Sequence, residues 1–153
     1  MVMLVMTSDV YAEVVAYCLE RLPEEACGML AGPAAEQGMA YYGNEVCAFY
    51  PARNAAGSAR LYTVDPLDHL RADRDVEMRG LVILGVVHSH THTEPYPSPV
   101  DIDQAPDPKW HYVIVGLGRP LPTMRVYSIH AGQVIEKELL IGGLRHEHAQ
   151  LII

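Results

Sequence analysis

The sequence predicts a single α/β domain in which a mixed β-sheet is flanked by helices. Amphipathic helical patterns alternate with short apolar runs, in the order helix, two strands, helix and four strands. The length of 153 residues suits one domain with a single hydrophobic core. No internal repeat or low-complexity tract interrupts this order.

The first predicted helix is capped by Thr7 or Ser8 and ends at Pro23. Within it, apolar residues recur at i, i+4 and i+8, which gives the helix one face directed toward a core. A short strand is expected over residues 26–32, where a Gly-Pro pair ends it. A second strand is expected over residues 41–49.

The middle of the chain is predicted to form a loop over residues 51–60 and a short extended segment over 61–64. A second helix follows, with Pro66 at its first position and its end near Arg79. Residues 81–87 then carry no polar side chain. Such a run is too short for a buried helix and fits a strand that is covered on both faces.

The last third of the chain reads as three strands and a tail. An apolar strand is expected over residues 111–117, and a hairpin over 123–129 and 133–140. We therefore predict one catalytic domain over residues 1–141 and a peripheral tail over 142–153.

The overall charge and the cysteines narrow the functional class. With 11 basic and 19 acidic residues, the net charge of −8 argues against non-specific binding to nucleic acid or to an anionic membrane surface. The three cysteines are widely spaced and form no C-x-x-C pair, which argues against a disulfide framework or a thiolate zinc site. No signal peptide or membrane-spanning run is recognisable, so a cytoplasmic location is expected.

The most informative motif is His88-Ser-His90, followed after seven residues by Ser98-x-x-Asp101. Residues i and i+2 of a strand point to the same face, with Cβ atoms about 7 Å apart. Both imidazoles can therefore reach one metal ion. Two histidines and one carboxylate leave the fourth position of a zinc ion open, which distinguishes a catalytic zinc site from a structural one.

Asp101 reaches the histidines only if the intervening segment turns back. Prolines at positions 95, 97 and 99 stiffen that segment. Ser98-Pro-Val-Asp101 also has the residues that begin a helix, with serine as N-cap, proline at N1 and an acid at N3. The helix-start and ligand roles are compatible, because an acid in the first turn is held in place and still offers an oxygen.

A hydrolytic metal site also needs a general base. The carboxylates near the predicted site are Glu24, Glu25, Glu94 and Asp103. Spacing alone does not choose among them, although the first two lie where the first helix gives way to a strand.

The segment Glu25-Ala-Cys-Gly-Met-Leu-Ala-Gly, together with the histidine motif, resembles the JAMM (MPN-plus) zinc metalloproteases. The resemblance extends from the first helix to about residue 129 and implies a cytidine-deaminase-like sandwich. It implies that one zinc ion per chain is held by His88, His90 and Asp101. It also implies that Glu25 is the base that activates the attacking water. Ser98 would stabilise the oxyanion or orient the water.

The segment 88–101 looks closest to small bacterial members that release cysteine from a ubiquitin-like sulfur-carrier protein. The resemblance thus implies a peptidase that acts after the C-terminal glycine of the carrier's Gly-Gly tail, in cysteine biosynthesis. Neither nucleic acid nor membrane is expected as a partner, and a homodimer is left open. The alternatives are an isopeptidase for other ubiquitin-like modifiers, a non-catalytic MPN-type interaction module, and a zinc hydrolase or deaminase for small molecules. The P-C-x-x-C element of the deaminases is absent.

Several nearby residues are given no catalytic role. His92 is interpreted as a loop histidine, Cys27 as a small core residue, and the histidines of segment 146–148 as part of a solvated tail. For Glu94 and Tyr96 a place in the cleft is left open.

Overall fold

A computed structural model describes residues 3–35 and 43–145, which form three helices and nine strands in one mixed sheet. The helices are α1 (Ser8–Glu20), α2 (Pro66–Met78) and α3 (Pro99–Asp103). The strands are β1 (Met3–Met6), β2 (Cys27–Gly32), β3 (Glu45–Val46), β4 (Ala48–Ala52), β5 (Val82–His90), β6 (His111–Gly116), β7 (Thr123–His130), β8 (Gln133–Ile141) and β9 (Leu144–Arg145). The predicted class, a mixed sheet flanked by helices, is confirmed.

The strand order is β3-β1-β8-β7-β6-β5-β2-β4, with β9 paired to β8. Strands β5 and β6 run parallel, as do β1 and its two neighbours, and the remaining pairs are antiparallel. Strand β5 is therefore paired on both sides, by β2 and by β6. These strands approach closely, since a Cβ added at Gly85 of β5 would lie 2.0 Å from the carbonyl oxygen of His111 on β6.

The structure adds to or differs from the sequence prediction at three places. The structure contains β1, which the sequence analysis did not predict; its four residues are stabilised by pairing with two strands distant in the chain, β8 (Met3 opposite Glu138) and β3 (Val5 opposite Glu45). The strand expected over 41–49 is divided, as far as it lies within the described residues, into β3 and β4, because β3 pairs with β1 and β4 with β2. The extended segment 61–64 makes only a single bridge, between Asn54 and Val64.

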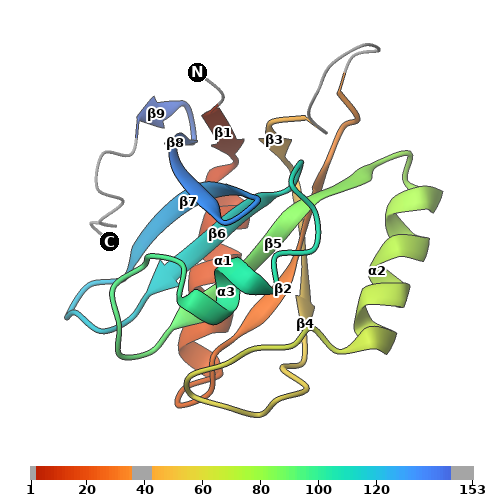
Figure 1. Cartoon of the computed structure of the whole chain (residues 1–153). Helices are drawn as coiled ribbons and strands as arrows, with labels where there is room; N and C mark the ends of the chain where they lie inside the picture. The colour runs from red at the N-terminus through yellow and green to blue at the C-terminus, as the bar shows by residue number, and fades with distance from the viewer. Residues whose placement is uncertain (1–2, 36–42, 146–153) are drawn as a thin grey trace.

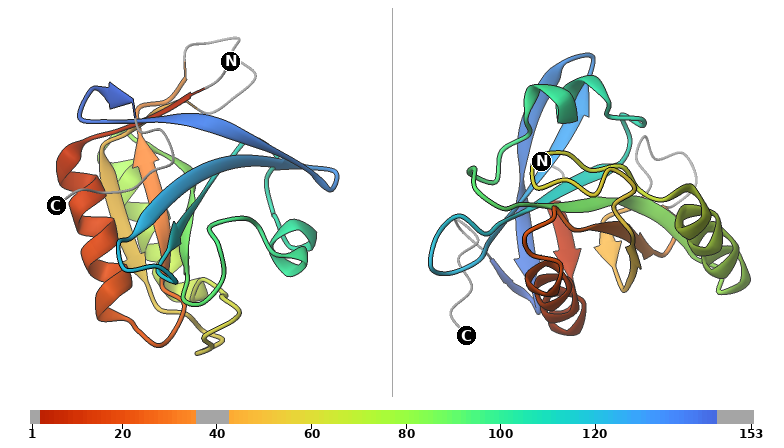
Figure 2. Two further views of the ribbon diagram at one scale, coloured as in Figure 1. Left: turned by 90° about the vertical axis from the view of Figure 1, so that its left-hand side faces the viewer. Right: turned by 90° about the horizontal axis from the view of Figure 1, so that it is seen from below.

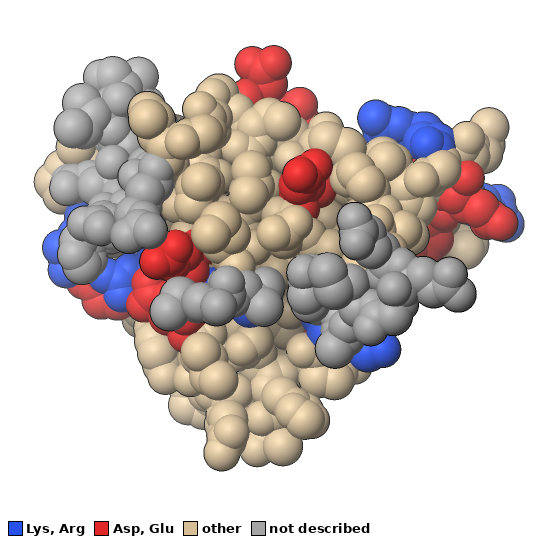
Figure 3. All heavy atoms as spheres, turned by 90° about the horizontal axis from the view of Figure 1, so that it is seen from above, with Lys and Arg blue, Asp and Glu red and all other residues tan. Residues whose placement is uncertain are grey.

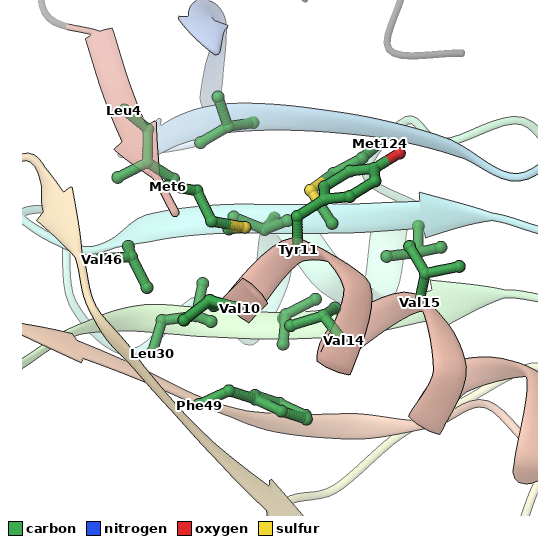
Figure 4. Close-up of a cluster of buried hydrophobic side chains, with 14 of the residues drawn as sticks. Leu4, Met6, Val10, Tyr11, Val14, Val15, Leu30, Val46, Phe49 and Met124 are labelled. Atoms are coloured by element: carbon green, nitrogen blue, oxygen red, sulfur yellow. The ribbon is translucent and has the colours of Figure 1, made fainter. Parts of the chain in front are cut away.

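Helix α1 covers one face of the sheet. Thr7 caps it as predicted, accepting a hydrogen bond from Val10 N at 3.2 Å. Its buried face packs on β1, β2, β4 and the central strands, and Figure 4 shows these side chains directed toward one another. The labelled members of this cluster are Leu4, Met6, Val10, Tyr11, Val14, Val15, Leu30, Val46, Phe49 and Met124.

The opposite face of the sheet carries α3 and the segments around it, while α2 lies along the β4 side (Figures 1 and 2). A second buried cluster lies under them and includes Met29, Ala72, Val86, Ile114 and Tyr127. Because successive side chains of a strand alternate between faces, Val86 of β5 packs in this second cluster, whereas Val87 packs in the first cluster, beneath α1. The central strands are thus covered on both faces, as the apolar run 81–87 predicted.

The surface seen from above is mostly uncharged (Figure 3). Acidic and basic side chains form small separate groups there, so the net charge of −8 is not gathered into one patch on this face. Within residues 3–35 and 43–145, no helix has both the length and the apolar character needed to cross a bilayer.

The chain does not leave the sheet at residue 141. Gly142 and Gly143 adopt positive φ values of 59° and 84° and form a turn, after which β9 pairs back onto β8. Most of the predicted tail, including the histidines of segment 146–148, lies outside the described residues.

A buried histidine lies at the far end of β6 from the histidine motif. His111 is 1% exposed, and its Nε2 donates to the carbonyl oxygen of Gly43 at 2.6 Å. Its Nδ1 therefore accepts from Lys137 Nζ at 2.9 Å. Burial and the nearby Lys137 charge lower the pKa of His111 to about 4. Protonation of His111 would replace this hydrogen bond by repulsion.

We predict that His111 makes the fold sensitive to acid. Between its ordinary pKa near 6.5 and its folded pKa near 4, the unfolded chain binds more protons, so stability falls as the pH falls. Lowering the pH from 7 to 5 should remove about 2 kcal/mol of unfolding free energy through this residue alone. His111→Gln keeps a donor for Gly43 but does not titrate. Urea unfolding at both pH values should therefore show a smaller acid loss in this variant, and an equal loss would contradict the assignment.

Candidate metal centre

The two histidines of the motif are the final residues of one face of β5. His88 and His90 are each 3% exposed and project to the same face, as the i, i+2 spacing predicted. Ser89 points to the α1 face, where its Oγ accepts a hydrogen bond from Ala26 N at 2.8 Å. Ser89 N in turn donates to Ala26 O at 3.0 Å. The strand that carries the histidines is thus fixed to the residues just before β2.

Three ligand atoms converge at this position. The Nε2 atoms of His88 and His90 lie 3.1 Å apart, and each is 3.1 Å from Asp101 Oδ2. Among the described residues, this is the one His, Cys, Asp or Glu group of three or more whose ligand atoms lie close enough to share a metal ion.

Helix α3 brings Asp101 back to the histidines. Ser98 is its N-cap, and a capping box links the two residues: Asp101 N donates to Ser98 Oγ at 3.1 Å, and Ser98 N donates to Asp101 Oδ2 at 2.9 Å. Burial acts to raise the pKa of Asp101, but the adjacent imidazoles of His88 and His90 and the hydrogen bond from Ser98 N outweigh it and hold the pKa below its usual range. The carboxylate is therefore ionised and fixed in orientation.

Each imidazole is oriented by a contact outside the triangle of Nε2 of His88, Nε2 of His90 and Oδ2 of Asp101 (the ligand triangle). His90 Nδ1 donates to the carbonyl oxygen of Glu94 at 2.8 Å, which leaves the lone pair of Nε2 free for a metal. The ring of His88 stacks on Tyr62, with centroids 4.1 Å apart and an interplanar angle of 19°. Sequence reasoning missed Tyr62, because nothing in its local pattern indicates a contact with a residue 26 positions away.

The donor set fits zinc. Tetrahedral zinc with ligands at about 2.0 to 2.1 Å needs neighbouring ligand atoms about 3.3 to 3.4 Å apart, close to the separations of 3.1 Å found here. Two imidazole nitrogens and one carboxylate oxygen are ligands that zinc prefers, and three protein ligands leave a position for substrate or water. His88, His90 and Asp101 are thus the residues that would hold the ion.

Burial distinguishes Glu25 from the other candidate bases. Its side chain is buried, whereas Glu94 and Asp103 are exposed and Glu24 pairs with Arg21 at the surface. The register Cys27 opposite His88, continued by the Ala26–Ser89 hydrogen bonds, places Glu25 opposite His90 on the same face. Burial raises the pKa of Glu25 to about 7, with His90 acting to lower it and Asp101 to raise it.

A cavity of about 270 Å³ adjoins the ligand triangle on the side of Asp101. Its walls are largely apolar and come from β2, β5, α2, α3 and the loop between β4 and α2. They include Tyr62, Val64, Val86, Val100 and Trp110. The metal centre therefore has apolar space beside it that an extended peptide could enter.

The other residues near the motif lie outside the ligand triangle. His92 is exposed, in line with its interpretation as a loop histidine, and Cys27 is buried. The side chain of Glu94 is 65% exposed and forms an ion pair with Arg119 at 2.8 Å, so only its backbone carbonyl serves the site. Tyr96 is also exposed and packs edge-on against Tyr127.

The chain matches one family model and several known proteins. A model described as prokaryotic homologues of the JAB domain matches residues 7–130. The sequence is 35% identical, over 135 residues and 88% of each chain, to a protein of Mycobacterium tuberculosis named CysO-cysteine peptidase. A curated protein of Mycobacterium bovis with the same name matches to the same extent.

Solved structures show the same fold. A protein from Desulfitobacterium hafniense superposes with a TM-score of 0.80 at 33% identity, covering 95% of this chain and 98% of that one. A JAB1/MPN domain protein from Archaeoglobus fulgidus gives a TM-score of 0.54 at 13% identity, covering 90% of this chain and 98% of that one. The predicted JAMM/MPN-like sandwich is therefore confirmed.

We predict that Asp101→Asn lowers the zinc affinity at least about 100-fold, because it replaces an ionised ligand with a neutral amide. Ser98→Ala, which removes the acceptor for Asp101 N, should lower the affinity about 10-fold. The measurement is competition with a chromogenic chelator.

Asp103→Asn is the matched control, since Asp103 is an exposed acid on the same short helix. It should leave the affinity unchanged. Equal zinc affinities for Asp101→Asn and Asp103→Asn would contradict the ligand assignment.

Proposed function

The chain belongs to the family of prokaryotic homologues of the JAB domain, and on that basis we propose that it is a zinc-dependent peptidase. This match confirms the resemblance to the JAMM family that the sequence motifs indicated. The proposed substrate is a ubiquitin-like sulfur-carrier protein whose C-terminal Gly-Gly tail carries one further residue, cysteine. The enzyme hydrolyses the bond after the final glycine and releases cysteine for cysteine biosynthesis in the cytoplasm.

The convergence of three ligand atoms beside a buried carboxylate carries this proposal. His88, His90 and Asp101 have the donor set of a catalytic zinc site, and Glu25 lies across the strands from His90. The 35% identity to a CysO-cysteine peptidase over most of both chains supports the choice of substrate. The complete ligand set argues against a non-catalytic MPN-type module.

One zinc ion per chain, when bound, would polarise the scissile carbonyl and lower the pKa of water at the site. The chain's own groups then move the proton. Glu25 accepts a proton from the attacking water, and the oxygen of that water bonds to the glycine carbonyl carbon. As the C–N bond breaks, Glu25 delivers the proton to the amine of cysteine. Its raised pKa of about 7, caused by burial, suits both directions of transfer near neutral pH.

Ser98 is proposed to donate a hydrogen bond to the oxygen that becomes negative during the reaction. Its Oγ already accepts from Asp101 N, which fixes the position of the hydroxyl group and leaves its hydrogen available. A fixed donor directed at a developing oxyanion stabilises the transition state more than the substrate.

We predict that Glu25→Gln keeps zinc but lowers kcat about 100- to 10,000-fold, because the amide cannot accept the proton. The assay incubates the enzyme with a carrier protein ending in Gly-Gly-Cys and follows loss of one cysteine residue by mass spectrometry. Chelator treatment of the wild-type protein should abolish the same reaction.

Glu24→Gln is the control, because Glu24 is the adjacent acid but lies half-buried at the surface, paired with Arg21. It should cleave at the wild-type rate. Normal cleavage by Glu25→Gln would remove Glu25 from the mechanism. If the wild-type protein left the cysteine adduct intact but released a modifier from a lysine side chain, the isopeptidase alternative would replace the proposed substrate.

A further inference from the structure

The loop between β4 and α2 (residues 53–64, the β4–α2 loop) supplies no metal ligand, yet it contacts the site at several points. We propose that Asn54 in this loop is a positioning residue: its side-chain amide fixes the loop against Glu25 and so determines where the proposed base lies. This role rests on the proposed function, because Asn54 acts on the reaction only through Glu25.

The side-chain amide of Asn54 is surrounded by backbone partners. Its Nδ2 lies 2.8 Å from the carbonyl oxygen of Leu61, 3.0 Å from that of Glu25 and 3.3 Å from that of Ser58, so its two hydrogens are shared among three acceptors. Its Oδ1 accepts from the backbone N–H groups of Ala56 and Thr63, each at 3.0 Å. One side chain thus joins the two ends of the loop to each other and to Glu25.

The backbone of Glu25 is held by this loop rather than by the sheet. Glu25 precedes Cys27, where the paired residues of β2 begin. Its N–H donates to the carbonyl oxygen of Ser58 at 2.8 Å, and its own carbonyl oxygen accepts from Asn54 Nδ2. Both backbone groups of the proposed base therefore bond to the β4–α2 loop.

The same loop contacts the strand that carries the histidines. Thr91 Oγ1 donates to the carbonyl oxygen of Ala59 at 2.8 Å, and Tyr62 stacks on His88. The base of the loop is closed by Ala55 N donating to Thr63 O at 2.8 Å and by the bridge between Asn54 and Val64. Asn54 therefore orders a loop that spans the ends of β2 and β5 and keeps Glu25 and His88 in a fixed relation.

Proton transfer depends on this relation, because a displacement of about 1 Å at a reacting group can cost about 100-fold in rate. Asn54→Asp tests the role with little change of shape. The aspartate keeps an acceptor for Ala56 N and Thr63 N but places an oxygen against the carbonyl oxygens of Glu25 and Leu61. We expect kcat to fall about 10- to 100-fold, with KM changed by less than about threefold and the zinc content unchanged.

The matched control is Ser58→Ala. It removes the hydroxyl that accepts from Arg60 N and Leu61 N, so it loosens the same loop. It leaves the Ser58 carbonyl bond to Glu25 N and the Asn54 bond to Glu25 O in place. Its kcat should stay within about threefold of wild type. An equal fall of kcat in the two variants would overturn the assignment in favour of general loop stability.

Two further measurements separate positioning from stability. Amide hydrogen exchange at Glu25 N should accelerate at least about tenfold in Asn54→Asp and remain slow in Ser58→Ala. In the Glu25→Gln background, adding Asn54→Asp should lower the residual kcat less than about threefold, because the group that Asn54 positions is already removed. An undiminished effect in that background would overturn the proposal.

The two proposals fail in different ways. If the wild-type enzyme releases cysteine and Glu25→Gln lowers kcat as predicted, full activity of Asn54→Asp overturns the positioning role alone. If the wild-type enzyme does not release cysteine, the proposed substrate fails. The exchange comparison at Glu25 N then still decides whether Asn54 holds Glu25, since it requires no substrate.

Discussion

The pairing of β2 with β5 is the constraint on which the site depends. With Cys27 opposite His88 and the Ala26–Ser89 hydrogen bonds continuing the pair, Glu25 lies opposite His90. A register shifted by one residue would turn the carboxylate to the α1 face, because neighbouring side chains of a strand point in opposite directions. The side chains of β2 and most of those of β5 are buried on both faces of the sheet, which holds the register.

Next to these two strands, the α3 capping box and the β4–α2 loop hold the two carboxylate residues of the site in place. The capping box of α3 holds Asp101 at the histidines, and the β4–α2 loop holds the backbone of Glu25. Both rely on side chains that bond to backbone groups, so Asp101 and the backbone of the proposed base Glu25 are each held by hydrogen bonds as well as by packing. The result is a site whose metal ligands and proposed base lie on different elements but are connected by short polar contacts.

Burial gives these groups their chemical character. Burial disfavours the charged form of a carboxylate, and at Glu25 this effect outweighs the attraction of nearby His90 and raises the pKa. Asp101 is also removed from water, yet two imidazoles and the Ser98 N–H stabilise its charge. Two carboxylates in one site thus differ in protonation because their hydrogen-bond partners differ, and this difference suits one to bind a cation and the other to carry a proton.

The sequence by itself determined the features that depend on local spacing. Periodicity placed α1, α2, the central strands and the β7–β8 hairpin, the i, i+2 spacing put His88 and His90 on one face, and the residues 98–101 predicted the cap of α3. Spacing alone did not distinguish the four acidic residues considered as the general base, and only the family resemblance favoured Glu25. The structure adds a physical reason, since of these four residues Glu25 is the one that is buried beside the ligands. Only the tertiary structure revealed that β1 forms, that Tyr62 stacks on His88 and that Asn54 contacts Glu25. These features join residues that are far apart in the chain, so no local pattern records them, and their stability comes from pairing, burial and hydrogen bonds that exist only after folding.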